Sequence, residues 1–196
     1  MVLNSDSESS SPSEVIQVLE GLSNIKVEKE VIDALSNILR NESDLVARSL
    51  AIEMLAKYKN NEFVPQILSE ILGSPPEGSL VRCAAARALG RVGGVQAREA
   101  LVKSIKTDTD YPLIVVNSVK ALGELGDAKA IPAIVELFAS KDDPRCPPYL
   151  IRRYAAEALG QIGAKDAVAT LKEIHRTDSH SSVREAAEGA IRILSS

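Results

Sequence analysis

The sequence predicts an all-α protein, an α-solenoid (superhelix) of about five helix pairs plus a closing helix. One helical pattern begins again at Val46, Leu80, Leu113, Leu150 and Ser182, at steps of 34, 33, 37 and 32 residues. Self-similarity at such a period is typical of stacked repeats rather than of one globular core. Aromatic residues make up only 3 % of the chain and Trp is absent, so Ala, Leu, Ile and Val must fill the core.

The first helix of each pair repeats apolar or small residues at positions i, i+4, i+8 and i+9. We expect these positions to share one helical face. The first position is occupied by Val46, Leu80, Leu113 and Leu150, and the last by Leu55, Leu89, Leu122 and Leu159. Glycine pairs then follow, and we expect them to end the first helices in a left-handed conformation. These pairs are Gly90 with Gly93, Gly123 with Gly126, and Gly160 with Gly163. The repeat from Val46 lacks the pair, so its turn should differ.

The second helices align in three apolar columns, four residues apart. The columns are Val31, Phe63, Ala97, Ala130 and Ala167; Leu35, Ile67, Leu101, Ile134 and Leu171; and Leu39, Ile71, Ile105, Phe138 and His175. Residues 14–22 supply an opening helix before the first of them. His175 breaks the last column, and we expect it to be half-buried near the end of the array.

The remaining composition bounds the class of protein. Residues 1–12 form an acidic, Ser-rich tail that we expect to be disordered, and residues 13–196 form one repeat domain. The formal net charge of −4 argues against general nucleic-acid binding, and no apolar run is long enough for a membrane span. The N-terminal residues lack the pattern of a signal peptide, and the two cysteines, Cys83 and Cys146, form no disulfide framework. We therefore expect a cytoplasmic protein.

The repeated segments resemble the HEAT repeat, in the short variety found in phycobilisome-lyase-like proteins. The resemblance covers roughly residues 43–194 and rests on LVRCAAARALGRVGG, VKALGELGDAKAIPAIVELF and LIRRYAAEALGQIGAKDAVATLKEI. It implies that a repeated Arg links neighbouring units by pairing with an acid or a carbonyl. That Arg is present as Arg48, Arg82, Arg152 and Arg184, whereas Val115 replaces it in the third full unit. These repeats serve many unrelated partners, so the fold is better specified than the function.

Candidate catalytic groups are few. Deoxyhypusine hydroxylase is a HEAT-repeat enzyme that holds iron with His-Glu pairs, but here His175 precedes Arg176 and His180 precedes Ser181. We therefore exclude that enzyme class and assign no metal site and no catalytic residue. We expect Cys83 to be partly exposed and Cys146 to be accessible, and neither has a neighbouring base in the sequence.

Two functions remain open. The first is a non-catalytic scaffold or adaptor that offers a face built from the second helices to a protein partner and needs no cofactor. We expect no small-molecule ligand under this hypothesis. The second follows from the resemblance, which implies a phycobilin lyase subunit or a phycobilisome-degradation factor that handles a linear tetrapyrrole on an antenna protein. The first is favoured, and enzymatic activity is expected only under the second.

We predict that a protein partner binds the connector at residues 141–149 and the helix that follows it. This connector lies within the longest step of the register and contains three prolines, which lower the entropy lost on binding. The residues expected to contact the partner are Arg145, Tyr149, Arg152, Arg153 and His175. Arg and Tyr are favoured at interface hot spots. The competing interpretation is an insertion in a tolerant loop, with arginines that only join the repeats.

Overall fold

The computed structural model describes residues 28–75, 77–108, 111–139 and 148–195, and over these ranges it contains helices and no strand. The first helices of the repeat are α3 (Leu45–Leu55), α5 (Ser79–Val92), α7 (Pro112–Leu125), α9 (Pro148–Ile162) and α11 (Ser181–Ser195). The second helices are α2 (Glu28–Asn41), α4 (Phe63–Leu72), α6 (Gly94–Thr107), α8 (Ile131–Ala139) and α10 (Val168–Thr177). Short 3-10 turns, Ala128–Ala130 and Lys165–Ala167, precede α8 and α10.

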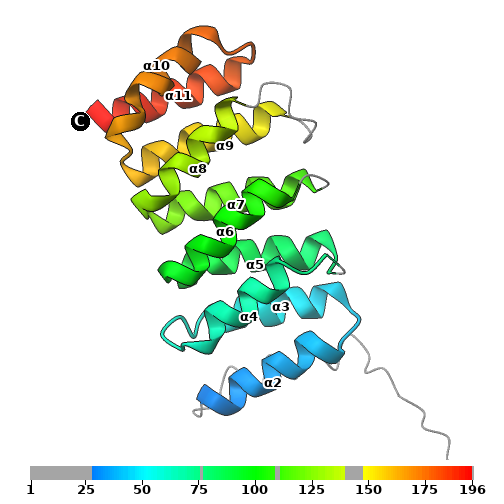
Figure 1. Cartoon of the computed structure of the whole chain (residues 1–196). Helices are drawn as coiled ribbons and strands as arrows, with labels where there is room; N and C mark the ends of the chain where they lie inside the picture. Colours follow the sequence, from blue (N-terminus) through cyan, green and yellow to red (C-terminus); the bar gives the residue numbers. More distant parts are fainter. Residues whose placement is uncertain (1–27, 76, 109–110, 140–147, 196) are drawn as a thin grey trace, which may run out of the picture.

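The helices form two layers in an elongated stack (Figure 1). Each first helix packs against the next first helix, from α3 through α5, α7 and α9 to α11. Each second helix packs against the first helix of the following unit. The prediction of an all-α solenoid is therefore confirmed. The expected tail and the opening helix at residues 14–22 lie outside the described residues.

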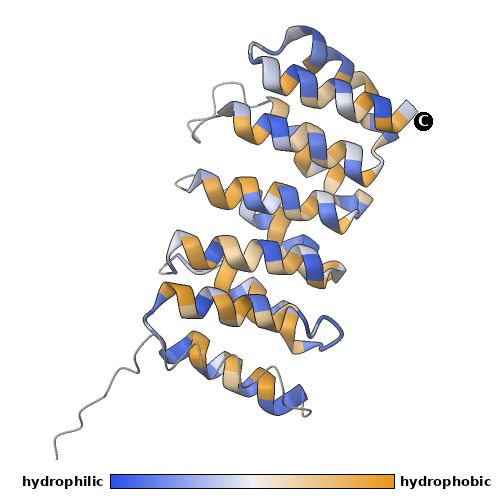
Figure 2. Ribbon diagram, turned by 180° about the vertical axis from the view of Figure 1, so that it is seen from behind, coloured by the Kyte–Doolittle hydropathy of each residue, from blue (hydrophilic) through white to orange (hydrophobic). Residues whose placement is uncertain are grey.

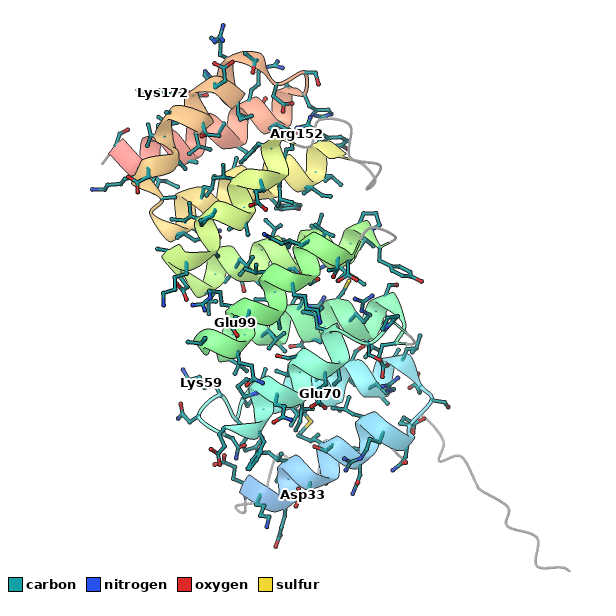
Figure 3. The ribbon with its side chains drawn as sticks, in the orientation of Figure 1. Asp33, Lys59, Glu70, Glu99, Arg152 and Lys172 are labelled. Atoms are coloured by element: carbon teal, nitrogen blue, oxygen red, sulfur yellow. The ribbon has the colours of Figure 1, made fainter. Side chains whose placement is uncertain are left out.

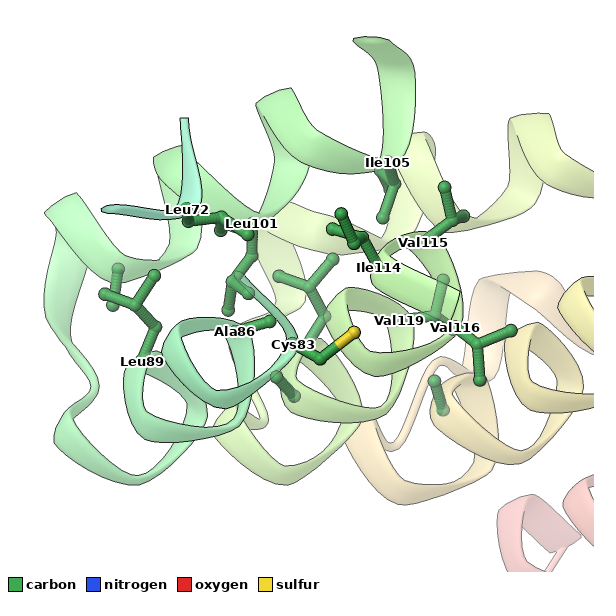
Figure 4. Packing of buried hydrophobic residues seen from close by; sticks show 14 of the residues in the cluster. Leu72, Cys83, Ala86, Leu89, Leu101, Ile105, Ile114, Val115, Val116 and Val119 are labelled. Carbon is green, nitrogen blue, oxygen red and sulfur yellow. The ribbon is translucent and has the colours of Figure 1, made fainter. Parts of the chain in front are cut away.

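The core lies between the two layers and consists of aliphatic side chains. Leu55, Leu89, Leu122 and Leu159, the last position of the first-helix pattern, are all fully buried, as predicted. Figure 4 shows Leu89 and Cys83 of α5 packed in this cluster with Leu101 of α6 and Ile114 of α7. Figure 2 shows the first helices from behind, with hydrophobic and hydrophilic turns interleaved along the stack.

The prediction that the first position of that pattern lies on the buried face is wrong. Val46, Leu80 and Leu113 are 54 %, 47 % and 63 % exposed, whereas Ala47, Val81 and Ile114, one residue later, are fully buried. An α-helix turns about 100° per residue, so positions i and i+9 point in opposite directions. A residue at i+1 lies much closer to the direction of i+9. The buried stripe therefore follows i+1, i+5 and i+9.

The two glycines of each pair have different roles. Gly93, Gly126 and Gly163 have φ angles of 76°, 69° and 80°, so they adopt positive φ values where the first helices end, as predicted. Gly90 instead lies inside α5, where an added Cβ would be 2.9 Å from the Cβ of Ala121 on α7. Gly123 and Gly160 face Ala158 and Ala190 of the next first helix in the same way. These glycines permit close approach of neighbouring first helices and are not caps.

The second unit departs from the others in register. Val64, Leu68 and Leu72 are its buried positions, whereas Phe63 is 58 % exposed and Ile67 is half-buried. Nine residues separate Leu55 from Val64, but eight separate Leu89 from Ala97 in the next unit. The interval between these buried positions is thus one residue longer where the glycine pair is absent. The extra residue rotates α4 and brings Phe63 and Ile67 to the surface.

The repeated arginines join the units, as the resemblance implied. Arg82 donates from Nε to the carbonyl oxygen of Leu72 (2.8 Å), at the end of α4, and pairs with Asp108 after α6. Arg48 pairs with Glu77, and Arg184 donates from Nη1 to the carbonyl oxygen of Asp178 (2.8 Å). Arg152 likewise pairs with Asp178. Val115, in the unit without the Arg, is fully buried.

Candidate functional site

A groove of about 960 Å³ lies between the second helices α2 and α4, and we call it the α2–α4 groove. The helices α2 and α4 form its two walls and make little contact with each other. The next two second helices, α4 and α6, pack together. Arg48 at the start of α3 and Glu77 after α4 line one end of the groove. This volume is within the range of binding sites in proteins.

Part of the groove lining is apolar and lies between α2 and α4. Ile32 and Leu39 of α2 and Ile71 of α4 are buried, and Ile67 is half-buried. Phe63 lies at the other end of α4 and is the aromatic residue among the lining residues of this groove. Because Phe63, Ile67 and Ile71 are spaced by four residues, they form one stripe along α4.

The rims of the groove are polar and exposed. Figure 3 labels Asp33 on α2 and Glu70 on α4. Gln66 donates from Nε2 to Glu70 Oε1 (3.0 Å) along the α4 rim. At the start of the two helices, Asn61 donates from Nδ2 to Glu28 Oε1 (3.0 Å), which ties the N-terminal end of α2 to that of α4.

Charged groups gather at the opposite end of the groove, and most of them have partners within the chain. Glu77 is engaged by Arg48, which donates from Nη2 to Oε1 (2.7 Å), and Glu42 Oε1 accepts from the backbone N–H groups of Ser43 (2.8 Å) and Asp44 (2.9 Å). The buried Nε of Arg48 and the buried Oε2 of Glu77 have no hydrogen-bond partner among the described residues. Arg40 is exposed and donates from Nη2 to Asn37 Oδ1 (3.0 Å). Arg40 is therefore the accessible cation among the groups described at this end of the groove.

A smaller cavity of about 430 Å³ lies between α4 and α6. Its lining includes Arg82, Ser104 and Asp108, which are already bonded to one another: Ser104 Oγ donates to Asp108 Oδ2 (2.7 Å), and Arg82 pairs with the same carboxylate. These groups close a link between units. Their hydrogen-bonding groups are therefore occupied within the chain.

The predicted contact residues at the other end of the array divide into two groups. Arg145 lies outside the described residues, as does most of the connector at residues 141–149. Tyr149 is half-buried, and its ring stacks on His180 with 3.8 Å between ring centroids and 1° between planes. Arg152 is buried and donates from Nε to Asp178 Oδ2 (2.7 Å) and from Nη2 to Oδ1 (3.1 Å). Both described side chains therefore have intramolecular partners.

Arg153 and His175 are more accessible. Arg153 donates from Nε to Glu157 Oε1 (2.9 Å), and its guanidinium lies 5.2 Å from the ring centroid of Tyr154. His175 is exposed rather than half-buried, and its Nδ1 lies 3.1 Å from the carbonyl oxygen of Arg184. Ile174 is buried beside it. Contact of these residues with a partner stays a prediction.

Burial and ion pairing shift several pKa values in this fold, including those of Asp178 and Cys83. Burial opposes ionisation of Asp178, but hydrogen bonds from Arg152 and from the backbone N–H of His180 outweigh it, and the pKa of Asp178 is lowered. Burial raises the pKa of the Cys83 thiol. Cys83 is buried, so the expectation that it is partly exposed is wrong. Its thiol is thus a poor nucleophile, while Cys146 lies outside the described residues.

Among the described residues, no group of three or more His, Cys, Asp or Glu side chains is placed to hold a metal ion. The same part of the chain contains no helix with the length and apolar character needed to span a membrane. The α2–α4 groove itself was missed from the sequence. The turn before Phe63 lacks the glycine pair and shifts the register of α4, but this pattern does not give the distance between α2 and α4.

The family model described as HEAT repeats matches residues 32–114, 66–147 and 116–192. The protein therefore belongs to the HEAT-repeat family. Within this family the chain is similar to subunits of phycobilin lyases, in line with the resemblance seen in the sequence. It is 31 % identical over 152 residues to the phycocyanobilin lyase subunit alpha of Picosynechococcus sp., a match that covers 71 % of this chain and 56 % of that relative.

Two further proteins are similar to this chain, and one of them is a deoxyhypusine hydroxylase, the class that the sequence analysis excluded from its His residues. The solved complex of CpcE and CpcF of phycocyanin lyase from Nostoc sp. matches with a TM-score of 0.63 and 26 % identity, over 87 % of this chain and 66 % of the matched chain. Deoxyhypusine hydroxylase-B of Oryza sativa subsp. japonica is 35 % identical over 104 residues, or 53 % of this chain and 32 % of that relative. The chain thus spans only part of the length of each relative.

Proposed function

We propose that the protein is a non-catalytic, protein-binding scaffold that receives its partner in the α2–α4 groove. The single observation that carries this proposal is the groove itself, an apolar channel with polar rims at a point where two second helices are not packed together. Exposed apolar surface rimmed by polar groups is typical of interaction sites. The scaffold needs no cofactor for this role.

The relatives support a protein partner. The structural relative is a complex of CpcE and CpcF, so a protein with the same repeats occurs in a heteromeric assembly. Extended helical arrays also offer long surfaces built from successive units, and these suit recognition of another protein.

Affinity capture with mass spectrometry tests the proposal. Tagged wild-type protein and the Phe63→Ala variant are used in parallel, with Val95→Ala as the matched control, because Val95 is an equally exposed apolar residue on α6. We expect one partner to be lost with Phe63→Ala and retained with Val95→Ala. Recovery of no specific partner by the wild-type protein contradicts the scaffold function.

A second candidate function is favoured by the curated relative. We propose as the alternative that the protein acts as a phycobilin lyase subunit or a phycobilisome-degradation factor, and handles a linear tetrapyrrole on an antenna protein. The phycocyanobilin lyase subunit supports this alternative through its sequence identity. Purified protein mixed with a linear tetrapyrrole should then change the visible absorption band of the pigment. The same measurement is made with free pigment and with pigment carried on an antenna subunit. If the protein leaves the absorption band unchanged in both cases, the alternative is contradicted.

The connector at residues 141–149 remains a second proposed contact surface. Arg153→Glu combined with Arg145→Glu tests it, because Arg153 is accessible and its exposed pair with Glu157 contributes only about 0.5 kcal/mol to stability. Capture of the same partners in the same amounts by the double variant places the contact elsewhere.

A further inference from the structure

We propose that the first-helix layer carries a second docking surface, which takes an amphipathic helix of a protein partner with acidic residues along one edge. The surface is a row of exposed apolar side chains at the N-terminal ends of α3, α5 and α7, and we call it the apolar row. The first-helix layer faces the viewer in Figure 2. The α2–α4 groove lies between second helices, so the apolar row is a separate surface and goes beyond the proposed function.

Most of the exposed large apolar side chains in the described part of the chain belong to the apolar row. Its members are Leu45, Val46 and Leu50 of α3, Leu80 of α5, Leu113 of α7, and Tyr111 directly before α7. The others, Phe63, Val95 and Ile193, are dispersed over α4, α6 and α11. A single exposed apolar residue needs no explanation, whereas a set on successive units is typical of an interaction surface.

The apolar row continues from one unit to the next. Each first helix packs against the following one, and helices in such contact lie about 10 Å apart. The side chain of Leu45 lies beside Gly78 at the start of α5, where an added Cβ would be 3.6 Å from Leu45 Cδ2. Val46, Leu80 and Leu113 are each the second residue of their helix, so they repeat in register along the stack.

This repeat distance matches a helix that lies across the first helices. Residues seven apart in an α-helix are separated by about 10.5 Å along its axis and point to nearly the same side. Leucines at i, i+7 and i+14 of a partner helix therefore reach three successive units of the apolar row. An extended strand gains no backbone pairing there, because the row belongs to helices and offers no free strand edge.

Cations accompany the apolar row on its two central helices. Arg87 and Arg91 are exposed on α5, seven and eleven residues after Leu80, and so lie on the same side of that helix. Lys120 is exposed on α7, seven residues after Leu113. A positive side chain thus begins about 10.5 Å from the row on both helices.

The acids of the same helices do not balance these cations. The helices α3, α5 and α7 contain two acidic residues, Glu53 and Glu124. The carboxylate of Glu53 is shared between Arg87 (3.5 Å) and Arg91. Lys120 has no ion pair among the described residues, and its Nζ lies 5.1 Å from the ring centroid of Tyr154. Positive charge is in excess beside the row, and acidic residues on the facing edge of the partner helix complement it.

Titration of the full-length, ¹⁵N-labelled protein with two synthetic peptides tests the inference. Both peptides are Ala-rich helices of about 18 residues with Leu at every seventh position. One peptide carries Glu along one edge beside the leucines, and the other carries Lys at the same positions. We expect saturable shifts of amide signals from α3, α5 and α7, and about threefold or more higher affinity for the Glu peptide. Equal affinity for the two peptides, or shifts confined to α2 and α4, overturns the inference.

Matched variants sharpen this measurement. Leu113→Asp should weaken binding of the Glu peptide about tenfold. Val95→Asp should leave it unchanged, because Val95 is similarly exposed and is also the second residue of its helix, but on α6. Lys120→Glu should reverse the preference between the peptides, whereas Lys172→Glu on α10 should not. Circular dichroism of each variant confirms that the array is folded. Equal weakening by Leu113→Asp and Val95→Asp contradicts the inference.

Other occupants of the apolar row give different results. Co-sedimentation with phosphatidylglycerol vesicles that Leu113→Asp abolishes, with no response to either peptide, assigns the row to a membrane surface and overturns the inference. A doubled molar mass by light scattering that Leu113→Asp returns to the monomer value assigns the row to a second copy of the chain, and also overturns it. Phe63→Ala should leave the affinity for the Glu peptide unchanged, because Phe63 lines the α2–α4 groove. Loss of peptide binding in that variant means that the peptide occupies the groove instead.

Discussion

The interior of the array, from α5 to α9, and its N-terminal part, from α2 to α4, solve the problem of stacking helices differently. In the interior, Gly90 and Gly123 lie inside the first helices and let Ala121 and Ala158 approach closely. In the N-terminal part no glycine pair follows α3, the interval between the buried positions of α3 and α4 is one residue longer, and α2 and α4 make little contact. The α2–α4 groove therefore lies where the register of α4 departs from that of the other second helices.

The largest expected effect tests whether the interior carries the stability of the array. Leu122→Asp, at a fully buried site of α7, should cost several kcal/mol, because it buries an unpaired carboxylate between units on both sides. Leu35→Asp, equally buried on α2, should unfold only the helices near it, since repeat arrays are coupled through neighbours. Hydrogen exchange followed by mass spectrometry distinguishes global loss of protection from local loss.

Lys103→Asp serves as the charge control for this comparison. Lys103 is exposed on α6, so its replacement should leave the thermal midpoint nearly unchanged. If Leu122→Asp and Leu35→Asp remove protection over the same residues, the two regions unfold as one unit.

The arginine links give the next contrast. Asp178→Asn should cost about 3 kcal/mol at neutral pH, because it leaves the buried Arg152 without its ion pair. Glu77→Gln should cost less than Asp178→Asn, because its pair with Arg48 is somewhat more accessible than the pair of Arg152 with Asp178. Urea unfolding of both variants measures the difference. Similar losses show that the N-terminal link is as strong as the C-terminal one.

The Asp178 pair also predicts a pH dependence. The pKa of Asp178 is lowered in the folded state, so its contribution is fully present above the ordinary Asp value of about 4 and is lost as the pH falls through the folded value. The difference in unfolding free energy between wild-type protein and Asp178→Asn should be constant from neutral pH down to about pH 5. It should shrink below about pH 4. A difference that stays constant into that acidic range shows that another group determines the stability there.

Glycine substitutions test close approach. Gly90→Ala should cost about 1–3 kcal/mol, because the new Cβ would lie 2.9 Å from the Cβ of Ala121. Gly189→Ala on α11 should instead stabilise the protein by about 0.5–1 kcal/mol, because no atom lies within 4 Å of the added Cβ and Ala favours helix. Thermal unfolding gives the sign of each change. A gain for both variants means that neighbouring first helices can separate without loss.

The sequence predicted the repeat, the helix order and the buried leucines because each depends on a local pattern that recurs. It predicted the arginine links for the same reason, through the resemblance to a family. It did not predict the groove, because this depends on the distance between α2 and α4, two helices without a shared sequence signal. It also did not predict the exposure of His175, where Ile174 rather than the aligned position takes the buried place.

The smallest expected effect concerns the feature in which both regions agree. Leu113 lies in the first turn of α7 and is 63 % exposed, and Val46 lies in the first turn of α3 with similar exposure. An acid near the start of a helix interacts favourably with the helix dipole. Leu113→Asp and Val46→Asp should therefore change the unfolding free energy by no more than about 0.5 kcal/mol.

Leu122, nine residues after Leu113 on the same helix, points the opposite way, so the pair Leu113→Asp and Leu122→Asp tests the assigned face within one helix. Equal losses of thermal midpoint for these two variants contradict the assigned face and show that the first position of the pattern, which Leu113 occupies, belongs to the core.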